Sequence, residues 1–206
     1  MLILSQVIYG VQDLDVATRQ IESRGFTVID GGHHPGLGTA NRIVPLGSSY
    51  FEILGIVDKQ EARRNPFGAA LIQQTQQGDR LVRWSLRTDC IDEIARERGL
   101  TPEKRSRLRP DGTLLTWTAA GLSLSLTEGW LPFFMQWDDP AHYPGNLQAY
   151  HVAQPQGIAW LEITPKNPRW LQQWLGTAQI PFRFIDGNPG VHRVGIFTPR
   201  EILMLP

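Results

Sequence analysis

The feature that most constrains the fold is an order of elements that occurs three times along the chain: a strand, a helix and three further strands. Residues 2–57 start with an apolar strand, continue with a helix between Asp13 and Gly25, and end with three strands. The same order returns over residues 80–138 and again over residues 157–206. A repeat of this kind decides how strands are grouped. The sequence therefore predicts three β-α-β-β-β modules, and the alternative is an α+β domain without a repeat.

Two segments of the chain are less clear in this pattern. In the second module "GTLLTWTAAG" and "LSLSLT" alternate apolar and polar residues, which predicts a hairpin, and "LPFFMQWDD" is a further apolar run. Residues 58–79 and 138–156 are polar or rich in proline, and we expect them to connect the modules.

Composition excludes several classes of partner. Twenty Lys and Arg residues balance twenty Asp and Glu residues, so the net charge is near zero. A protein without net positive charge is not expected to bind nucleic acid or an anionic membrane through its overall charge. The single cysteine, Cys90, cannot form a disulfide within the chain. No signal peptide is recognisable, and no apolar run reaches the roughly 18 residues of a membrane span. We therefore expect a cytoplasmic protein.

Four stretches carry a resemblance to a known family: "VQDLDVATRQIESRGFTVIDGGHHPGLGTANRIVPLGSSYFEIL", "VRWSLRTDCIDEI", "LRPDGTLLTW" and "LPFFMQW". They resemble glyoxalase-like proteins of the vicinal-oxygen-chelate superfamily, which unites glyoxalases, bleomycin-resistance proteins and dioxygenases. The most specific part is G-G-x-H-P-G-x-G-T-A-N, residues 31–41. The resemblance implies an α+β fold in which paired modules form a curved mixed sheet, or half-barrel, around a cavity. Residues 1–138 would then form one cavity domain.

Many members of this superfamily bind a divalent metal through the first and last strands of each module. The resemblance carries these ligand positions onto Gln6, Glu52, either Arg83 or Trp84, and Gln136. Arginine and tryptophan are not ligands for divalent metals, and amide oxygens are weak ones because they bring no charge. We therefore predict a site without metal or other cofactor, with a divalent metal as the less favoured alternative.

The glycine-rich run does not fit a phosphate-binding loop. Gly36 and Gly38 form G-x-G, but Asn41 stands where a dinucleotide fingerprint has glycine, and a strand follows. The glycines instead permit positive φ in a loop at the mouth of the sheet. This loop would fix His34, which either holds the loop through a hydrogen bond or contacts a ligand as a general base, a role that its usual pKa near 6.5 suits.

Alternation along the strands predicts which side chains share the cavity. Tyr50, Glu52 and Leu54 lie on one face of the fourth strand, and Gln6 and Ile8 lie on one face of the first. Whether the neighbouring strand presents Asn41 or Arg42 to this side remains open. The aromatic residues Trp84, Trp117, Phe134 and Trp137 are expected to line the second half of the cavity, with ordinary core packing as the alternative.

Glu52 has two interpretations. Burial in an apolar pocket raises the pKa of a carboxyl group and makes it a better proton acceptor near neutral pH. Glu52 is therefore a candidate general acid or base, or a hydrogen-bonding anchor for a ligand. The alternative is a structural ion pair with Arg42, Arg83 or Arg109.

The resulting prediction is a metal-independent lyase or isomerase that transfers a proton on a small organic substrate. Glu52 and His34 are the predicted catalytic residues. The predicted ligand-binding residues are Gln6, Asn41, Tyr50, Trp84, Trp117, Phe134 and Gln136. The alternative is a resistance-type protein that binds a small ligand without chemistry. The third module has no fourth to pair with, so it either packs beside the first two or pairs with its copy in a homodimer.

Overall fold

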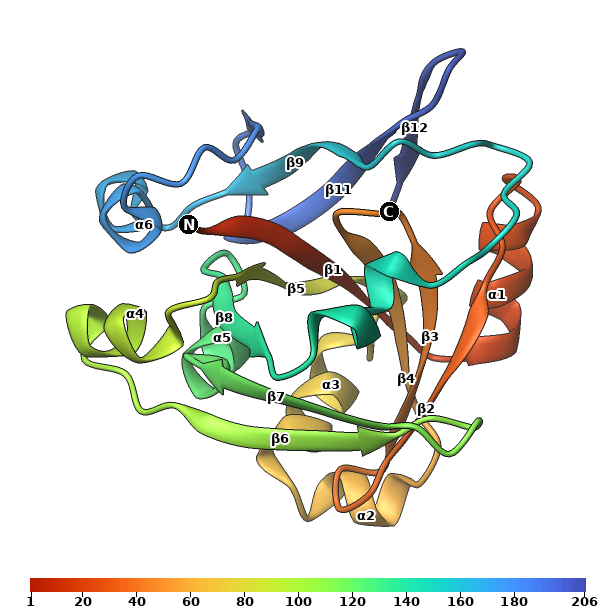
Figure 1. The fold of residues 1–206 in the computed structure, drawn as a ribbon, viewed down its shortest axis with the longest axis horizontal. Helices are drawn as coiled ribbons and strands as arrows, with labels where there is room; N and C mark the ends of the chain where they lie inside the picture. Colours follow the sequence, from red (N-terminus) through yellow and green to blue (C-terminus); the bar gives the residue numbers. More distant parts are fainter.

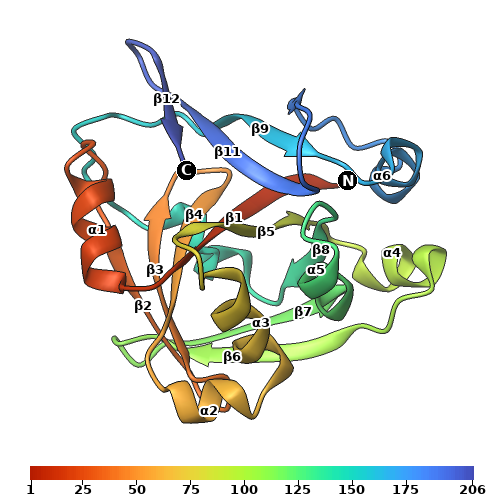
Figure 2. The same cartoon turned by 180° about the vertical axis from the view of Figure 1, so that it is seen from behind.

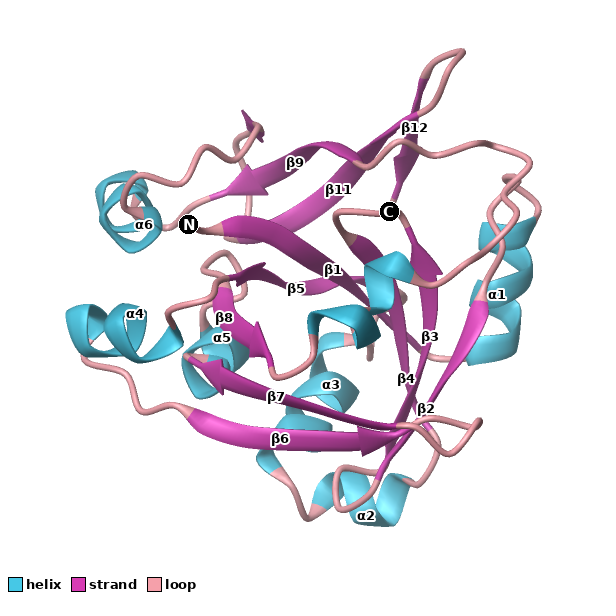
Figure 3. Ribbon diagram, in the orientation of Figure 1, coloured by secondary structure: helices cyan, strands magenta, loops and turns pink.

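Two β-sheets form the framework of the protein in the computed structural model, which describes residues 1–206 (Figure 1). The larger sheet has eight strands in the order β2-β3-β4-β1-β5-β8-β7-β6, with parallel and antiparallel neighbours, and it curves around an interior space (Figure 3). The predicted α+β fold with a curved mixed sheet is confirmed. Its strands are β1 Ile3–Val11, β2 Ile29–His34, β3 Thr39–Pro45, β4 Tyr50–Ile56, β5 Arg80–Arg87, β6 Glu103–Leu108, β7 Leu114–Ala120 and β8 Phe133–Trp137.

The large sheet consists of two modules with the same connectivity. In each module the first strand pairs in parallel with the last: β1 with β4, and β5 with β8. The second strand, β2 or β6, lies at an edge of the sheet. The modules join through the antiparallel pair β1–β5, where Gln6 lies opposite Ser85. Curvature brings the two edge strands together, so that the backbone at Gly32 lies close to the carbonyl of Leu108.

The third segment follows the expected order of elements but pairs its strands differently. Its strands are β9 Ile158–Thr164, β10 Phe182–Phe184, β11 Gly190–Phe197 and β12 Ile202–Leu205, and its helix is α6 Pro168–Leu175. Here the first strand pairs with the second and the third, giving the order β10-β9-β11-β12. This small sheet covers the outer face of β1 and β5 (Figures 1 and 2). Side chains of both sheets, such as Trp84 and Val194, belong to one hydrophobic core.

Helices occupy three segments for which the sequence predicted no helix. "LSLSLT" is not a strand but the helix α5 Leu122–Thr127, because Leu122 and Leu126 are also spaced one helical turn apart and both face the cavity. Residues 58–79 contain α2 Lys59–Arg63 and α3 Pro66–Gln74, whose first turns are capped by Asp58 and Asn65. The helices that the sequence did predict are α1 Leu14–Glu22, α4 Ile91–Arg98 and the helix α6 of the third segment. None of the helices is both long and apolar enough to cross a membrane.

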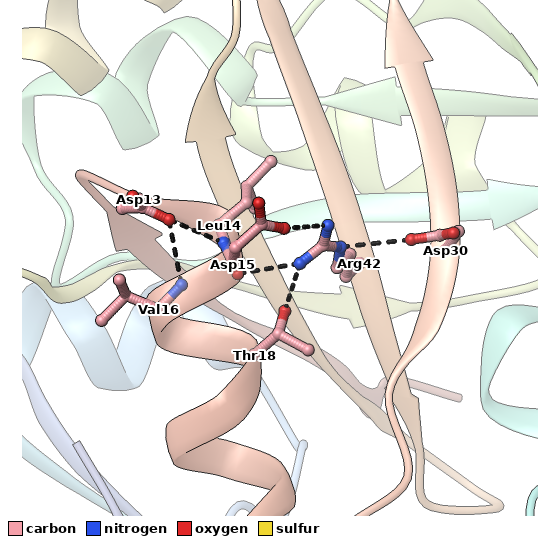
Figure 4. Close-up of polar contacts among 7 residues, drawn as sticks. All are labelled: Asp13, Leu14, Asp15, Val16, Thr18, Asp30 and Arg42. Carbon is pink, nitrogen blue, oxygen red and sulfur yellow. Dashed lines mark hydrogen bonds and ion pairs between the residues drawn. The ribbon is translucent and has the colours of Figure 1, made fainter.

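Arg42 connects three elements of the first module on the outer side of the sheet (Figure 4). From β3 its guanidinium pairs with Asp15 on α1 at 2.6 Å and with Asp30 on β2 at 3.1 Å. It also donates to the hydroxyl of Thr18 at 2.7 Å and to the carbonyl of Leu14 at 3.0 Å. Asp13 caps the same helix by accepting from two of its backbone N–H groups. Arg42 therefore fixes α1 to the sheet and points away from the cavity.

Replacing Arg42 with alanine is expected to lower the free energy of unfolding by about 1–2 kcal/mol, because four polar partners lose a partly buried charged donor. Urea denaturation measures this change. Arg42→Lys keeps the charge but not the planar fork, so it is expected to recover less than half of the loss. Full recovery by lysine would show that charge alone acts here.

Candidate functional site

A cavity of about 260 Å³ opens on the inner face of the curved sheet. Its walls come from both modules, from the loop after β2, and from the helices α3 and α5. Small-molecule sites are concave, mostly apolar and carry a few polar groups, and this cavity has that character. Its volume lies slightly below the usual range of about 300–1,000 Å³, which suits a small ligand.

Glu52 provides the only carboxylate of the cavity wall. It lies on β4, and only 7% of its surface is exposed. Its Oε1 accepts a hydrogen bond from Asn41 Nδ2 at 2.7 Å, and no Lys or Arg nitrogen lies within 4.0 Å of its oxygens. Burial raises the pKa of Glu52, whereas the hydrogen bond from Asn41 and the charges of Arg107 and Arg83 lower it, and burial has the larger effect. Glu52 is thus a buried carboxyl group with one hydrogen bond and a raised pKa.

Arg107 reaches this group from the other module. It lies on β6, and its Nη1 donates to Asn41 Oδ1 at 2.7 Å, so that Asn41 connects it to Glu52. The glycine pair on β2 makes room for this contact. A Cβ on Gly31 would lie 2.0 Å from Asn41 Oδ1 and 2.6 Å from Arg107 Nη1. Glycine at position 31 therefore allows the two side chains to meet where the edge strands approach.

Arg83 is the second arginine near Glu52. It lies on β5, is completely buried, and none of its three guanidinium nitrogens has a hydrogen-bond partner. Its guanidinium carbon lies 4.1 Å from the centre of the Phe67 ring, and that ring belongs to the cavity wall. Burial lowers the pKa of Arg83 to about 10, against the opposing effect of Glu52. At neutral pH it therefore adds a buried positive charge next to the cavity.

His34 lies in the cavity wall at the start of the loop that the glycine-rich motif forms. Its Nδ1 is 3.0 Å from the hydroxyl of Thr39. Gly36 and Gly38 have positive φ, and their N–H groups donate to the carboxylate of Glu61 on α2. Burial, together with the charges of Arg107 and His33, lowers the pKa of His34 to about 3. Since so weak a base does not accept protons at neutral pH, His34 is better suited to hydrogen bonding than to the predicted role of general base.

The stability of the protein is expected to fall in acid because of His34. Its pKa is about 6.5 in the unfolded chain and about 3 in the folded one, so the unfolded state binds the proton first as the pH drops. Between pH 7 and pH 4.5 the wild type should lose about 2 kcal/mol more than His34→Gln. Urea denaturation at the two pH values measures this difference. His33→Gln, at the exposed neighbouring position, is the control: it removes only the smallest of the three causes and should keep most of the wild-type loss.

The structure brings six of the nine predicted site residues together. His34, Glu52 and four of the predicted ligand-binding residues lie in the cavity wall: Gln6, Asn41, Tyr50 and Trp117. Trp137 lies there too, with its ring centre 5.3 Å from that of Trp117. Of the two candidates on β3, Asn41 faces inward and Arg42 outward.

Three predicted ligand-binding residues do not reach the cavity. Trp84 and Phe134 point to the outer face of the sheet, where Trp84 packs against Phe182 and Phe134 against Trp174. Gln136 accepts a hydrogen bond from the backbone N–H of Ile91 at the start of α4, also outside the cavity. Side chains alternate along a strand, so the inward positions are the adjacent ones, Arg83, Phe133 and Met135.

Arg107 and Phe67 are wall residues that the sequence did not single out. The sequence "EKRSRL" on β6 has the composition of a solvent-exposed edge strand, so it does not indicate that its second arginine, Arg107, is buried. Phe67 follows Asn65 and Pro66, a pair that is typical of the start of a helix. That signal predicts α3 but not the face that it presents.

The residues of the wall do not fit a divalent metal. The inward positions on the first and last strands of the modules carry Gln6, Glu52, Arg83 and Met135. Nowhere do three His, Cys, Asp or Glu side chains come together in a way that could hold an ion. The positive charges of Arg83 and Arg107 also act on the one carboxylate that would have to bind the metal. These features disfavour a cation at this position.

Comparison with solved structures finds several similar chains. A hypothetical protein from Staphylococcus aureus superposes with a TM-score of 0.67 at 14% identity, over 99% of this chain and 84% of that one. A methylmalonyl-CoA epimerase from Mycobacterium tuberculosis gives a TM-score of 0.45 at 15% identity, over 65% of this chain and 85% of its own. A Mn(II)-bound glyoxalase from Novosphingobium aromaticivorans gives 0.48 at 13% identity, over 93% of this chain and 64% of its own.

At 14% identity and a TM-score of 0.67, the likeness to the protein from Staphylococcus aureus concerns the fold alone. No curated protein matches the sequence. The sequence profile of one family, described as a glyoxalase-like domain, matches residues 6–178, which include the cavity and most of the chain. The chain therefore belongs to the glyoxalase-like domain family, as its resemblance to the vicinal-oxygen-chelate superfamily predicted.

Proposed function

We propose that this protein binds a small organic molecule in the cavity and transfers a proton to or from it through Glu52, as a lyase or an isomerase. The observation that carries the proposal is the state of Glu52. Its carboxyl group lies in the cavity wall, accepts one hydrogen bond from Asn41 and has no cation in ion-pair contact. A structural ion pair would have given it a guanidinium or ammonium partner. A raised pKa brings a carboxylate closer to the range in which general acids and bases act.

The step begins with a carbon–hydrogen bond next to a carbonyl group of the substrate. Glu52 takes the proton as an O–H bond forms. The electron pair of the broken bond forms a carbon–carbon double bond, and the π pair of the carbonyl group moves onto its oxygen to give an enolate. Return of the proton to the carbon, at the same or another face or position, completes an isomerisation. Loss of a leaving group from the adjacent carbon completes a lyase reaction instead.

Other wall residues have supporting roles in this scheme. Arg107 and the amide of Gln6 are polar groups of the wall that can stabilise the negative charge of an enolate oxygen. Asn41 holds the Glu52 carboxyl group in position and is itself held by Arg107. We assign His34 to hydrogen bonding, since its low pKa keeps it neutral.

Hydrogen–deuterium exchange tests the proposal without knowledge of the substrate. The protein is incubated in D₂O with 2-oxo acids, their methyl esters and hydroxyketones, and proton NMR follows the loss of the signal next to the carbonyl group. Exchange catalysed by the wild type and lost in Glu52→Gln supports the proposal. Binding of compounds without any exchange would instead support the non-catalytic alternative, which the aromatic pair Trp117–Trp137 favours.

Removal of metal is expected to leave the exchange rate unchanged, because the donor set does not suit a divalent ion. The measurement is the same NMR assay after dialysis against EDTA, and again after addition of Mn²⁺ or Zn²⁺. A rate that falls with EDTA and recovers with metal would contradict the metal-independent mechanism.

The predicted homodimer remains a prediction. Sedimentation velocity over a range of protein concentrations measures the oligomeric state.

A further inference from the structure

The cavity and its immediate surroundings hold more positive than negative charge. Glu52 is the only acid in the wall, whereas Arg105 and Arg107 both belong to it and Arg83 lies against the wall residue Phe67. Arg105 is neutralised by an ion pair with Glu103. Two buried guanidinium groups therefore face a single carboxyl group.

Most N–H donors of Arg107 make no hydrogen bond within the protein. Only 5% of its surface is exposed, and its bond to the neutral amide of Asn41 is the one hydrogen bond that it makes. No carboxylate pairs with it. A buried charge is costly without a counter-charge, and a guanidinium has five N–H donors in a planar arrangement. The remaining donors of Arg107 are thus free to bind an acceptor within the cavity.

Two further polar groups at the site lack partners. The guanidinium of Arg83 has no hydrogen bond at any of its nitrogens, and its charge acts on Glu52. The side chain of Gln6, in the wall and 3% exposed, has a buried Oε1 without a donor. Native proteins seldom leave such groups unsatisfied, and a missing ligand is one physical reason for the exception. The guanidinium of Arg83 lacks an acceptor, whereas the Gln6 oxygen lacks a donor, so only the arginine favours an anion.

We infer that the ligand of this cavity is a small organic carboxylate whose anionic group pairs with Arg107. The inference rests on the proposed function and names the class of its substrate. With such a ligand bound, two carboxyl groups face two buried guanidinium groups and the charges balance. A carboxylate is planar and matches the fork of a guanidinium, and the apolar wall contacts the organic part, with residues such as Trp117 and Phe133.

Matched pairs of carboxylates and their neutral amides test this inference. Benzoate and benzamide, phenylacetate and phenylacetamide, and hexanoate and hexanamide are titrated into the protein at pH 7.5 by isothermal titration calorimetry. Tryptophan fluorescence follows the same titrations, because Trp117 and Trp137 lie in the wall. At least one carboxylate is expected to bind roughly tenfold or more tightly than its amide, as one charge-assisted contact implies.

Three variants test whether Arg107 causes the preference for carboxylates. Arg107→Gln is expected to abolish it, whereas Arg107→Lys keeps the charge and should retain part of it. Arg109→Gln removes the same charge two residues further on, at an arginine that pairs with Asp111 outside the wall, and should bind as the wild type does. Unfolding temperatures of all variants verify that each is folded.

The outcomes separate this inference from the proposed function. Amides that bind as tightly as their carboxylates would overturn the carboxylate assignment and leave the proton-transfer proposal standing. Failure of every carboxylate to bind, or an equal loss in Arg109→Gln and Arg107→Gln, would also overturn it. Carboxylate binding that depends on Arg107, without any deuterium exchange, would support the ligand class and contradict the catalytic role of Glu52.

Discussion

Glu52→Gln is expected to slow deuterium exchange by a factor of about 10²–10⁴, the usual contribution of a positioned acid or base. Glutamine has nearly the same shape and keeps an oxygen that can accept the hydrogen bond from Asn41. It has no proton-accepting carboxylate. The loss should therefore arise from chemistry rather than from a disturbed cavity, and ligand affinity should change much less than rate.

The same variant is expected to be more stable than the wild type at neutral and alkaline pH. The pKa of Glu52 is higher in the folded chain than in the unfolded one, mainly because of burial. Folding is then opposed as the pH rises through the range between the two pKa values, since the unfolded state releases its proton first. Glutamine does not titrate, so its melting temperature should exceed that of the wild type above this range, and the two should converge in acid.

Opposite signs for activity and stability would identify Glu52 as a functional group held at a cost to the fold. Glu22→Gln, on the exposed surface of α1, is the control that should change neither. A Glu52→Gln variant that is both inactive and less stable would mean that the carboxylate is mainly structural. Differential scanning calorimetry at several pH values provides the measurement.

Trp84→Ala is expected to lower the free energy of unfolding by about 3–5 kcal/mol, the usual cost of removing a fully buried large aromatic residue. Trp84 has no exposed surface, and its indole donates to the carbonyl of Trp130 at 3.2 Å. Its ring meets that of Phe182 edge to face, with the centres 5.5 Å apart. Trp84 therefore connects the eight-stranded sheet to the small sheet that covers it.

Urea denaturation measures this loss, with Trp117→Ala as the matched control. Trp117 is only partly buried in the cavity wall, so its removal should cost about 1–2 kcal/mol. The two variants separate a core role from a cavity role. Equal costs would contradict the assignment of Trp84 to the core between the sheets.

The sequence predicted the first module well because its signals agree with one another. Alternation of side chains on β1 and β4 identified Gln6, Tyr50 and Glu52 as inward-facing. The capping residue Asp13 identified the start of α1. Gly36 and Gly38 lie in a loop with positive φ, as predicted, whereas Gly31 and Gly32 at the start of the run belong to β2. The spacing of apolar residues, every second residue in a strand and every 3.6 residues in a helix, is a local property. It can therefore be read from a segment without knowledge of the rest of the chain.

The second module was harder for a physical reason. A shift of one residue moves every side chain of a strand to the opposite face, and the ladder between β1 and β5 contains two irregularities. This is why Trp84 and Gln136 were placed in the cavity although Arg83 and Met135 take those positions. Arg107 was missed for another reason. Its burial results from contact between β2 and β6, which lie about 70 residues apart in sequence, and no local pattern encodes it.

The small sheet has a consequence for where the chain can be cut. The resemblance suggested that residues 1–138 form a domain by themselves, yet the outer face of β1 and β5 buries apolar side chains against β9 and β11. A fragment that ends after β8 would expose Val7, Trp84 and Leu86 to water as one continuous apolar surface. Such a surface promotes self-association, so we expect a chain that is cut after β8 to aggregate.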